Sequence, residues 1–244
     1  MAGAIQERFD ELAKGLATKR LSRRQVLKSF VAGALLATPL GALWNRGPSG
    51  LTAEAQALDT TTYSAVGDFS PAQIPSPFPQ PGVWSYGYQA SSGSGFTLYT
   101  IHSNPWGPDF DQWSLDGNPP HVTYNRKGAT ATFSTITQPA DVLNLHPGPA
   151  GQKSVVRWTA PFSGTVRIEG RFQGIDTHGT TTDVAIVHNS TETLFNSSVN
   201  GYGAKVPFSI TRSVSAGDTI DFSVGYGSNA NYFNDSTGLS VSIT

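Results

Sequence analysis

The stretch that decides the fold class is Gly164-Thr165-Val166-Arg167-Ile168-Glu169-Gly170-Arg171-Phe172. Its apolar and charged residues alternate with a period of two, which is the pattern of a strand with one buried and one solvated face. An amphipathic helix would instead repeat its apolar positions every three to four residues. The stretch therefore predicts a β-strand that buries Val166, Ile168 and Phe172.

The same alternation recurs toward the end of the chain. It predicts three further sets of inward-facing side chains: Phe208 and Ile210; Ile220, Phe222, Val224 and Tyr226; and Leu239, Val241 and Ile243. Residues 182–188 are apolar at both alternating sets, so we expect a central strand covered on both faces. Further strands are expected near residues 63–69, 83–89, 96–101, 129–133, 142–145 and 154–159, which makes about ten in all.

The composition supports many short strands joined by turns. The chain of 244 residues contains 26 Gly and 16 Pro, and only 14% of its residues are charged. These features favour tight turns over amphipathic helices, and this length suits one β-sandwich domain. We therefore predict an all-β protein, an antiparallel β sandwich of the jelly-roll type, preceded by a helical signal peptide.

Charge and cysteine content exclude several functions. After residue 57 the chain has eight Lys and Arg against thirteen Asp and Glu, a formal charge of −5. A mildly acidic domain has no basic stripe for phosphates, so nucleic acid is not an expected partner. The absence of cysteine excludes disulfides, thiolate metal sites and a thiol nucleophile.

The N-terminal part has the layout of an export signal. A charged region (1–28) ends in Ser22-Arg23-Arg24-Gln25-Val26-Leu27-Lys28, a weakly apolar region (29–43) follows, and residues 44–57 offer small-x-small cleavage patterns at 53–55 and 55–57. The apolar region is too short to span a bilayer, so no stable membrane span is expected after processing. The arrangement resembles a twin-arginine (Tat) signal, with Val26 where Phe is more usual. The resemblance implies the Tat translocase as a partner during export.

Residues 58–244 are expected to form a single domain working outside the cytoplasm, in the extracellular space, at the cell surface or in the periplasm. Four phrases support a further resemblance: residues 83–88 (VWSYGY), 145–149 (LHPGP), 154–161 (SVVRWTAP) and 217–222 (GDTIDF). They resemble an exported domain of cyanobacterial and planctomycete-type surface proteins, a family without an assigned activity. The Ala-Pro and Gly-Asp turns between apolar strands are also similar to those of jelly-roll carbohydrate-binding modules.

A turn-rich segment, residues 106–118, has the densest mixture of side chains suited to binding a sugar. Sugars pack their C–H groups on aromatic planes and need paired donors and acceptors for their hydroxyls. An aromatic lid on the sandwich edge is the alternative interpretation of the same tryptophans. The candidate ligand-binding residues, with two tyrosines from later turns, are Trp106, Asp109, Asp111, Trp113, Asn118, Tyr202 and Tyr232.

Calcium is the candidate metal, because it prefers oxygen ligands and is a common way to hold loops in a domain without disulfides. The oxygen-rich group is Asn229, Asn231, Asn234 and Asp235. Its spacing is not that of an EF-hand, and Asn and Asp are equally typical of turns. No other cofactor is expected.

Catalysis is not indicated. The five histidines are scattered without the short spacing of a zinc site. Glycoside hydrolysis needs two facing carboxylates, but Glu169 lies between Arg167 and Arg171 on one strand face, which is typical of a surface ion-pair row. We therefore predict a secreted non-catalytic module that binds an extracellular polysaccharide or an envelope glycan. The alternatives are a structural surface or matrix protein without a small ligand, and a polysaccharide hydrolase or lyase.

Overall fold

The structure is a computed structural model that describes residues 61–76, 82–90 and 95–244. These residues belong to one unit, Asp59–Thr244. The predicted signal peptide, residues 1–57, lies outside the described residues. In the part of the chain that is described, no helix is long and apolar enough to cross a membrane.

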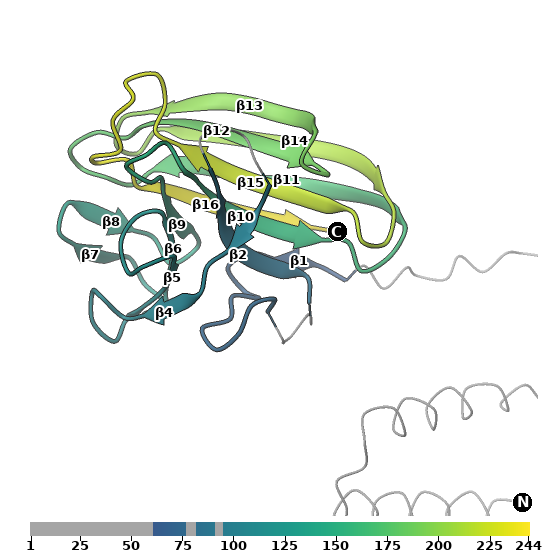
Figure 1. The fold of residues 1–244 in the computed structure, drawn as a ribbon, viewed down its shortest axis with the longest axis horizontal. Helices are drawn as coiled ribbons and strands as arrows, with labels where there is room; N and C mark the ends of the chain where they lie inside the picture. Colours follow the sequence, from purple (N-terminus) through teal and green to yellow (C-terminus); the bar gives the residue numbers. More distant parts are fainter. Residues whose placement is uncertain (1–60, 77–81, 91–94) are drawn as a thin grey trace, which may run out of the picture. The chain divides into compact units, whose positions relative to one another are not determined.

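The described residues form two large antiparallel sheets and one small one (Figure 1). The eight-stranded sheet has the order β14-β11-β16-β9-β6-β5-β4, with β1 also paired to β16. Its strands are β1 (Tyr63–Ser64), β4 (Ile101–Ser103), β5 (Phe110–Ser114), β6 (His121–Asn125), β9 (Leu143–His146), β11 (Gly164–Gly174), β14 (Lys205–Val214) and β16 (Thr237–Ile243).

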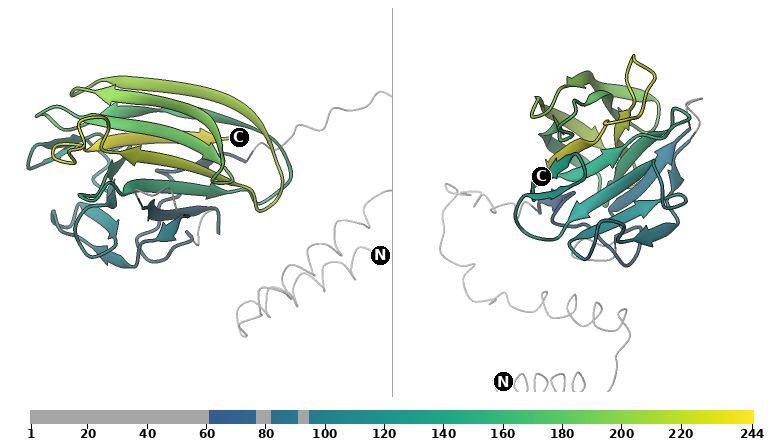
Figure 2. Two further views of the ribbon diagram at one scale, coloured as in Figure 1. Left: turned by 45° about the horizontal axis from the view of Figure 1, so that its top comes forward. Right: turned by 90° about the vertical axis from the view of Figure 1, so that its left-hand side faces the viewer.

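The six-stranded sheet has the order β13-β12-β15-β10-β2-β3. Its strands are β2 (Trp84–Gln89), β3 (Thr97–Leu98), β10 (Lys153–Thr159), β12 (Thr181–His188), β13 (Glu192–Asn200) and β15 (Thr219–Gly225). The small sheet is a hairpin of β7 (Ala131–Phe133) and β8 (Ile136–Gln138). Figure 2 shows the strands of the two large sheets stacked as layers.

The chain alternates between the two layers from β9 onward. β9, β11, β14 and β16 lie in the eight-stranded sheet, whereas β10, β12 and β15 lie in the six-stranded sheet. Only β12 and β13 are successive strands of this part that pair directly as a hairpin. This is the crossing pattern of a jelly roll, so the predicted fold class is confirmed.

The core lies between the sheets and contains the side chains that the alternation predicts. Val166, Ile168 and Phe172 of β11 are buried, and Ile220, Phe222 and Val224 of β15 face them from the other sheet. The largest fully buried side chains are Trp84, Trp158, Tyr86, Tyr99, Phe172 and Phe222. Each such side chain contributes about 2–3 kcal/mol through burial of apolar surface.

Several strand predictions are wrong, and β6 and β8 were not predicted. β12 pairs with β13 and β15, but it is not covered on both faces, because its second apolar set, Ala185 and Val187, is half-buried. β5 lies inside the segment predicted to be turns: its central pair Asp111 and Gln112 is polar, yet both side chains are buried and hydrogen-bonded. β13 was not predicted, because its sequence is mostly polar and its face is largely exposed.

Tyr226 also differs from its prediction. It follows β15 instead of belonging to it, and its side chain is half-buried. The predicted strand over 63–69 is reduced to the two residues of β1, because Asp68 accepts hydrogen bonds from the backbone N–H of Ser64 at 2.9 Å and from the indole of Trp84 at 3.1 Å. The bond from Ser64 closes the chain into a turn, and the bond from Trp84 fixes the Asp68 side chain in that turn.

A buried ion pair ties two central strands of the six-stranded sheet together. Arg157 of β10 and Asp221 of β15 are cross-strand partners, and the guanidinium donates to both carboxylate oxygens at 2.6 and 2.7 Å. The Asp221 side chain is fully buried, and the Phe96 ring lies 4.1 Å below the guanidinium carbon. Phe96 reaches this place because Gly87 of β2 has no Cβ, which would lie 2.8 Å from its ring.

Removing one partner of this pair leaves the other charge buried without compensation. We expect Asp221→Ala to lower the free energy of unfolding by about 3 kcal/mol, as measured by urea denaturation. Glu169→Ala is the matched control, because Glu169 pairs with Arg167 on the exposed face of β11. It should cost less than about 1 kcal/mol. Equal losses of unfolding free energy in both variants would contradict the stabilising role of the Arg157–Asp221 pair.

Candidate functional site

A pocket of about 440 Å³ lies over one end of β5, β6 and β9, and we call it the loop pocket. Its size falls in the range of small-molecule sites. It brings together residues from the strands and from the four connections β4–β5, β5–β6, β11–β12 and β15–β16, together with the hairpin β7–β8. The lining residues are Pro105, Trp106, Gln112, Gly117, Asn118, Pro119, His121, Ser134, Thr135, Ile136, His146, Asp176, Tyr232, Phe233 and Asn234.

The base of the loop pocket is polar because of strand register. Trp113 of β5, Val122 of β6 and Leu145 of β9 face the core, so the alternate positions of these strands face away from it. His121 of β6 and His146 of β9 are direct cross-strand partners on that outer side. In the next rung, Gln112, Thr123 and Asn144 follow one another across the three strands, and Thr123 donates to Gln112 Oε1 at 3.3 Å.

The hairpin β7–β8 forms one wall. A small apolar cluster, separate from the main core, holds it against the eight-stranded sheet: Phe110, Ala131, Phe133, Ile136 and Ile175. The Trp106 ring packs on Phe133 with centroids 4.9 Å apart, yet 43% of Trp106 stays exposed. The cluster therefore supports an aromatic plane that still has a face toward solvent.

The β15–β16 connection contributes Tyr232, Phe233 and Asn234 to the lining. Tyr232 and Phe233 pack on each other at a centroid distance of 4.5 Å, and Tyr232 meets the edge of His146 at 6.1 Å. Phe233 is 62% exposed. Asp235 anchors this connection at its end, because its Oδ1 accepts from the backbone N–H of Thr181 at 2.9 Å and from the Thr181 hydroxyl at 3.1 Å.

The two histidines at the base are uncharged at neutral pH. Burial lowers the pKa of His121 well below its ordinary value, and the neighbouring His146 adds to this shift. Burial also lowers the pKa of His146, whose Nδ1 lies 2.9 Å from the Pro147 carbonyl and donates to it. Within the described residues, neither ring nitrogen of His121 has a hydrogen-bond partner.

Three of the predicted ligand-binding residues come together in the loop pocket. Trp106 and Asn118 come from the segment 106–118, and Tyr232 comes from a connection far along the chain, yet all three line the same cavity. Asn234, predicted as a calcium ligand, lines it too.

Trp113 and Asp111 do not reach the pocket, which corrects their assignment. Trp113 is only 7% exposed because it faces the core, and its indole N–H donates to the Ser70 carbonyl at 2.8 Å. Asp111 is buried against Arg126, whose Nε donates to it at 2.8 Å, and against Asn104 at 3.0 Å. Burial opposes the ionisation of Asp111, but these hydrogen bonds outweigh it and lower its pKa. Both side chains are therefore structural.

Two further predicted residues lie outside the lining. Asp109 is half-buried in the β4–β5 connection, where its carbonyl accepts from the backbone N–H of Arg126 at 2.8 Å. Tyr202 is 53% exposed in the turn between β13 and β14. It has the exposure expected of a binding tyrosine, but it stands apart from the other aromatic residues of the loop pocket.

The oxygen-rich group predicted for calcium is used largely within its own loop. Asn229 Oδ1 accepts from the backbone N–H of Asn231 at 3.1 Å, and Asn231 Oδ1 accepts from that of Phe233 at 2.9 Å. Among the described residues, no three His, Asp or Glu side chains gather around a common metal position. Asp235 Oδ2 is buried without a partner in this part of the chain. Calcium binding by this group stays a prediction.

Sequence patterns did not reveal Gln112, His121, His146, Asp176 or Phe233 as pocket residues. Each belongs to a different element, and only the sheet register and the loop packing bring them together. The one available signal was that His121 and His146 lie on strands next to apolar residues that face inward, which places both histidines on the outer side.

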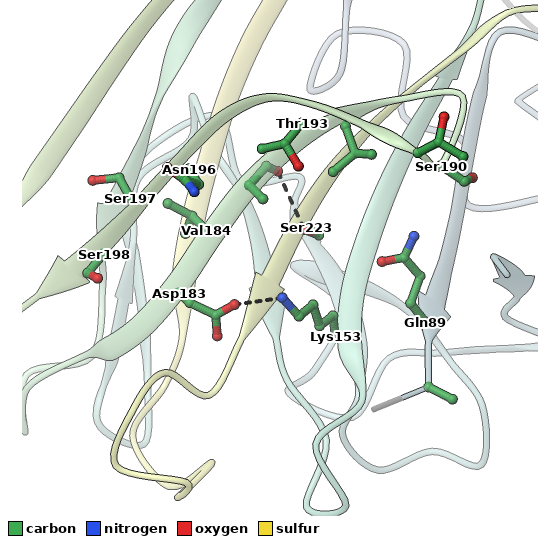
Figure 3. Close-up of a pocket in the computed structure, with 14 residues that line it drawn as sticks. Gln89, Lys153, Asp183, Val184, Ser190, Thr193, Asn196, Ser197, Ser198 and Ser223 are labelled. Atoms are coloured by element: carbon green, nitrogen blue, oxygen red, sulfur yellow. Dashed lines mark hydrogen bonds and ion pairs between the residues drawn. The ribbon is translucent and has the colours of Figure 1, made fainter. Parts of the chain in front are cut away.

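A second, larger hollow of about 630 Å³ lies on the outer face of the six-stranded sheet (Figure 3), and we call it the sheet hollow. Its lining is rich in hydroxyl and amide groups, most of them from β13 and from the turn that precedes it. Lys153 and Asp183 point toward each other across it, with Nζ and Oδ2 2.7 Å apart. No aromatic side chain is among the residues that line this hollow.

No protein-family model matches the chain, and no match is found among curated proteins. Solved structures with some likeness include a CBM35 module from Cellvibrio japonicus (15% identity, 48% of this chain and 81% of that chain, TM-score 0.31). Another is a CBM51 module from Clostridium perfringens, in complex with methyl-galactose (12% identity, 64% and 99%, TM-score 0.34). A third is an Arthrobacter globiformis isomalto-dextranase complexed with panose (12% identity, 65% and 23%, TM-score 0.28). At these TM-scores the likeness carries no argument about function.

Asp235 makes the stability of the pocket wall depend on pH. Burial raises the pKa of Asp235 to about 6, against the hydrogen bonds from Thr181, and the carboxylates of Asp176 and Asp183 add to the rise. The folded state therefore binds this proton more tightly than the unfolded state does. The protonated Asp235 adds to the free energy of unfolding at low pH, and this contribution is lost as the pH rises through about 6.

Asp235→Asn keeps an acceptor for Thr181 and cannot ionise. Relative to the wild type, we expect this variant to gain about 1 kcal/mol of unfolding free energy between about pH 5 and about pH 8, measured by denaturant titration at both pH values. Asp116→Asn, at an exposed position, is the control and should track the wild type. If the difference in unfolding free energy between Asp235→Asn and the wild type is the same at both pH values, Asp235 does not cause the pH dependence.

Proposed function

We propose that this protein is an exported, non-catalytic module that binds a saccharide in the loop pocket. The observation that carries the proposal is the pairing of partly exposed aromatic walls with a polar base. Trp106, Tyr232 and Phe233 all line the cavity, and Trp106 and Phe233 are exposed. Gln112 and Asn118 add amide groups within the same cavity.

This arrangement matches both parts of sugar recognition. An aromatic ring offers an apolar plane for the C–H face of a pyranose, and amides and hydroxyls offer donors and acceptors for its rim. Trp106 is held by Phe133, so little conformational freedom is lost when a ligand packs on it. The sheet hollow has the polar groups but lacks the aromatic plane, so it fits a sugar less well.

The lining argues for binding over catalysis. Glycoside hydrolysis uses two carboxyl groups that face each other across the bond to be cleaved. Asp176 is the one carboxylate among the residues that line the loop pocket. In the sheet hollow the lining carboxylate is Asp183, which is paired with Lys153. We therefore propose that the protein retains a saccharide without cleaving it.

Export belongs to the same proposal. The twin-arginine-like segment at residues 22–28 would direct the folded domain across the membrane. A domain without cysteine needs no oxidant to fold before that step. The ligand would then be an extracellular polysaccharide or a glycan of the cell envelope.

The test is binding of the purified protein to a panel of polysaccharides and to a glycan array, followed by titration calorimetry on each positive. Trp106→Ala and Tyr232→Ala should each weaken binding at least about tenfold, which corresponds to about 1.4 kcal/mol. Each variant removes an aromatic face from a wall of the loop pocket.

Tyr202→Ala is the matched control, because it removes an exposed aromatic residue from a turn outside the pocket. It should bind like the wild type, and thermal melting should show that all three variants fold. Binding that survives both pocket substitutions would place the site elsewhere. No binding to any glycan would overturn the proposal and favour a structural surface protein.

A further inference from the structure

The loop pocket is lined by many polar side chains but few charged ones. Among the described residues, its lining contains amides, hydroxyls and two imidazoles, but no lysine and no arginine. Of these lining residues, Asp176 is the one with a carboxylate. A ligand that enters this pocket therefore meets many hydrogen-bonding groups and a single negative charge.

The imidazoles do not supply a compensating positive charge. His121 is 4% exposed and His146 is 9% exposed, and each ring faces the other with centroids 5.2 Å apart. Burial lowers the pKa of both rings, so both are neutral at neutral pH. Two imidazolium ions at this distance would also repel each other.

The Asp176 carboxylate is held in place. It is 2% exposed, its Oδ2 accepts from the Thr135 hydroxyl at 2.9 Å, and its Oδ1 accepts from the backbone N–H of His178 at 2.9 Å. The Thr135 bond connects it to the hairpin β7–β8, and the His178 bond belongs to the β11–β12 connection. With both oxygens hydrogen-bonded, the carboxylate keeps its position beside the cavity.

We propose that the loop pocket selects saccharides without an ionised group and rejects uronic acids. This inference rests on the proposed function of the same pocket. An anionic sugar would lose part of its hydration on entry and would find no cation to replace it. It would also be repelled by the fixed carboxylate, in a cavity where solvent screens charge less than it does in water.

Matched ligands test this selection. Methyl glucoside and methyl galactoside are each compared with the methyl glycoside of the corresponding uronic acid, by titration calorimetry at neutral pH. If the inference is right, a neutral sugar binds and its uronic acid counterpart binds at least about tenfold more weakly. Equal or tighter binding of the uronic acid would overturn the inference and leave the proposed function standing.

Two variants separate charge from shape. Asp176→Asn removes the negative charge, so the preference for the neutral sugar should shrink. Its amide oxygen can still accept from the backbone N–H of His178, and its NH2 group can donate to the Thr135 hydroxyl. Asn118→Lys adds a cation at an exposed position of the lining, so binding of the uronic acid should improve. Asp141→Asn removes a carboxylate outside the lining and should leave the preference unchanged. If the preference is the same in all four proteins, charge does not set it and the inference fails.

The outcome also distinguishes this inference from the proposed function. Binding of neither sugar type, with folded protein and across the wider panel, would overturn the proposed function and this inference with it. Binding of the uronic acid as tightly as the neutral sugar, through Trp106 and Tyr232, would overturn the inference alone.

Discussion

The structure depends on the contact between the inner faces of its two sheets. Trp84 and Trp158 lie side by side on β2 and β10, and Phe222 on β15 extends the same layer. On the facing sheet, Phe172 and Ile168 of β11 complete the contact. With no disulfide to close the chain, this buried layer is the main source of stability. It also leaves the outer faces free to carry polar groups, and the loop pocket is built on one of them.

Much of the fold was predictable because the alternating strands report their buried face directly. β11, β15 and β16 bury the side chains that their period of two indicates. The failures came where a strand has no apolar alternation, as in the exposed β13, or where polar residues are buried. β5 has a buried polar centre because Arg126 and Thr123 satisfy it, and a pattern based on hydropathy cannot anticipate partners that come from another strand.

The site was only partly predictable for a related reason. Trp106, Asn118 and Tyr232 could be selected by residue type and turn context, and they share one pocket. The sequence could not tell Trp106 from Trp113, since both lie in one short segment. Their positions relative to β5 separate them. Trp113 lies on the inner side of the strand, whereas Trp106 precedes it. The histidines at the base depend on the pairing of β6 with β9, which is a long-range contact.

The position of β16 has a kinetic consequence. It is the last of the described strands in sequence, yet it lies inside the eight-stranded sheet, with β11 along one edge and β9 and β1 along the other. A nascent chain that has not yet emerged beyond residue 236 lacks the strand that joins the two parts of this sheet. The sheet can therefore close only after β16 has been synthesised, through contacts of large sequence separation that form slowly. Until then β9 and β11 both expose unpaired edges, and such edges make an incompletely folded chain prone to aggregation.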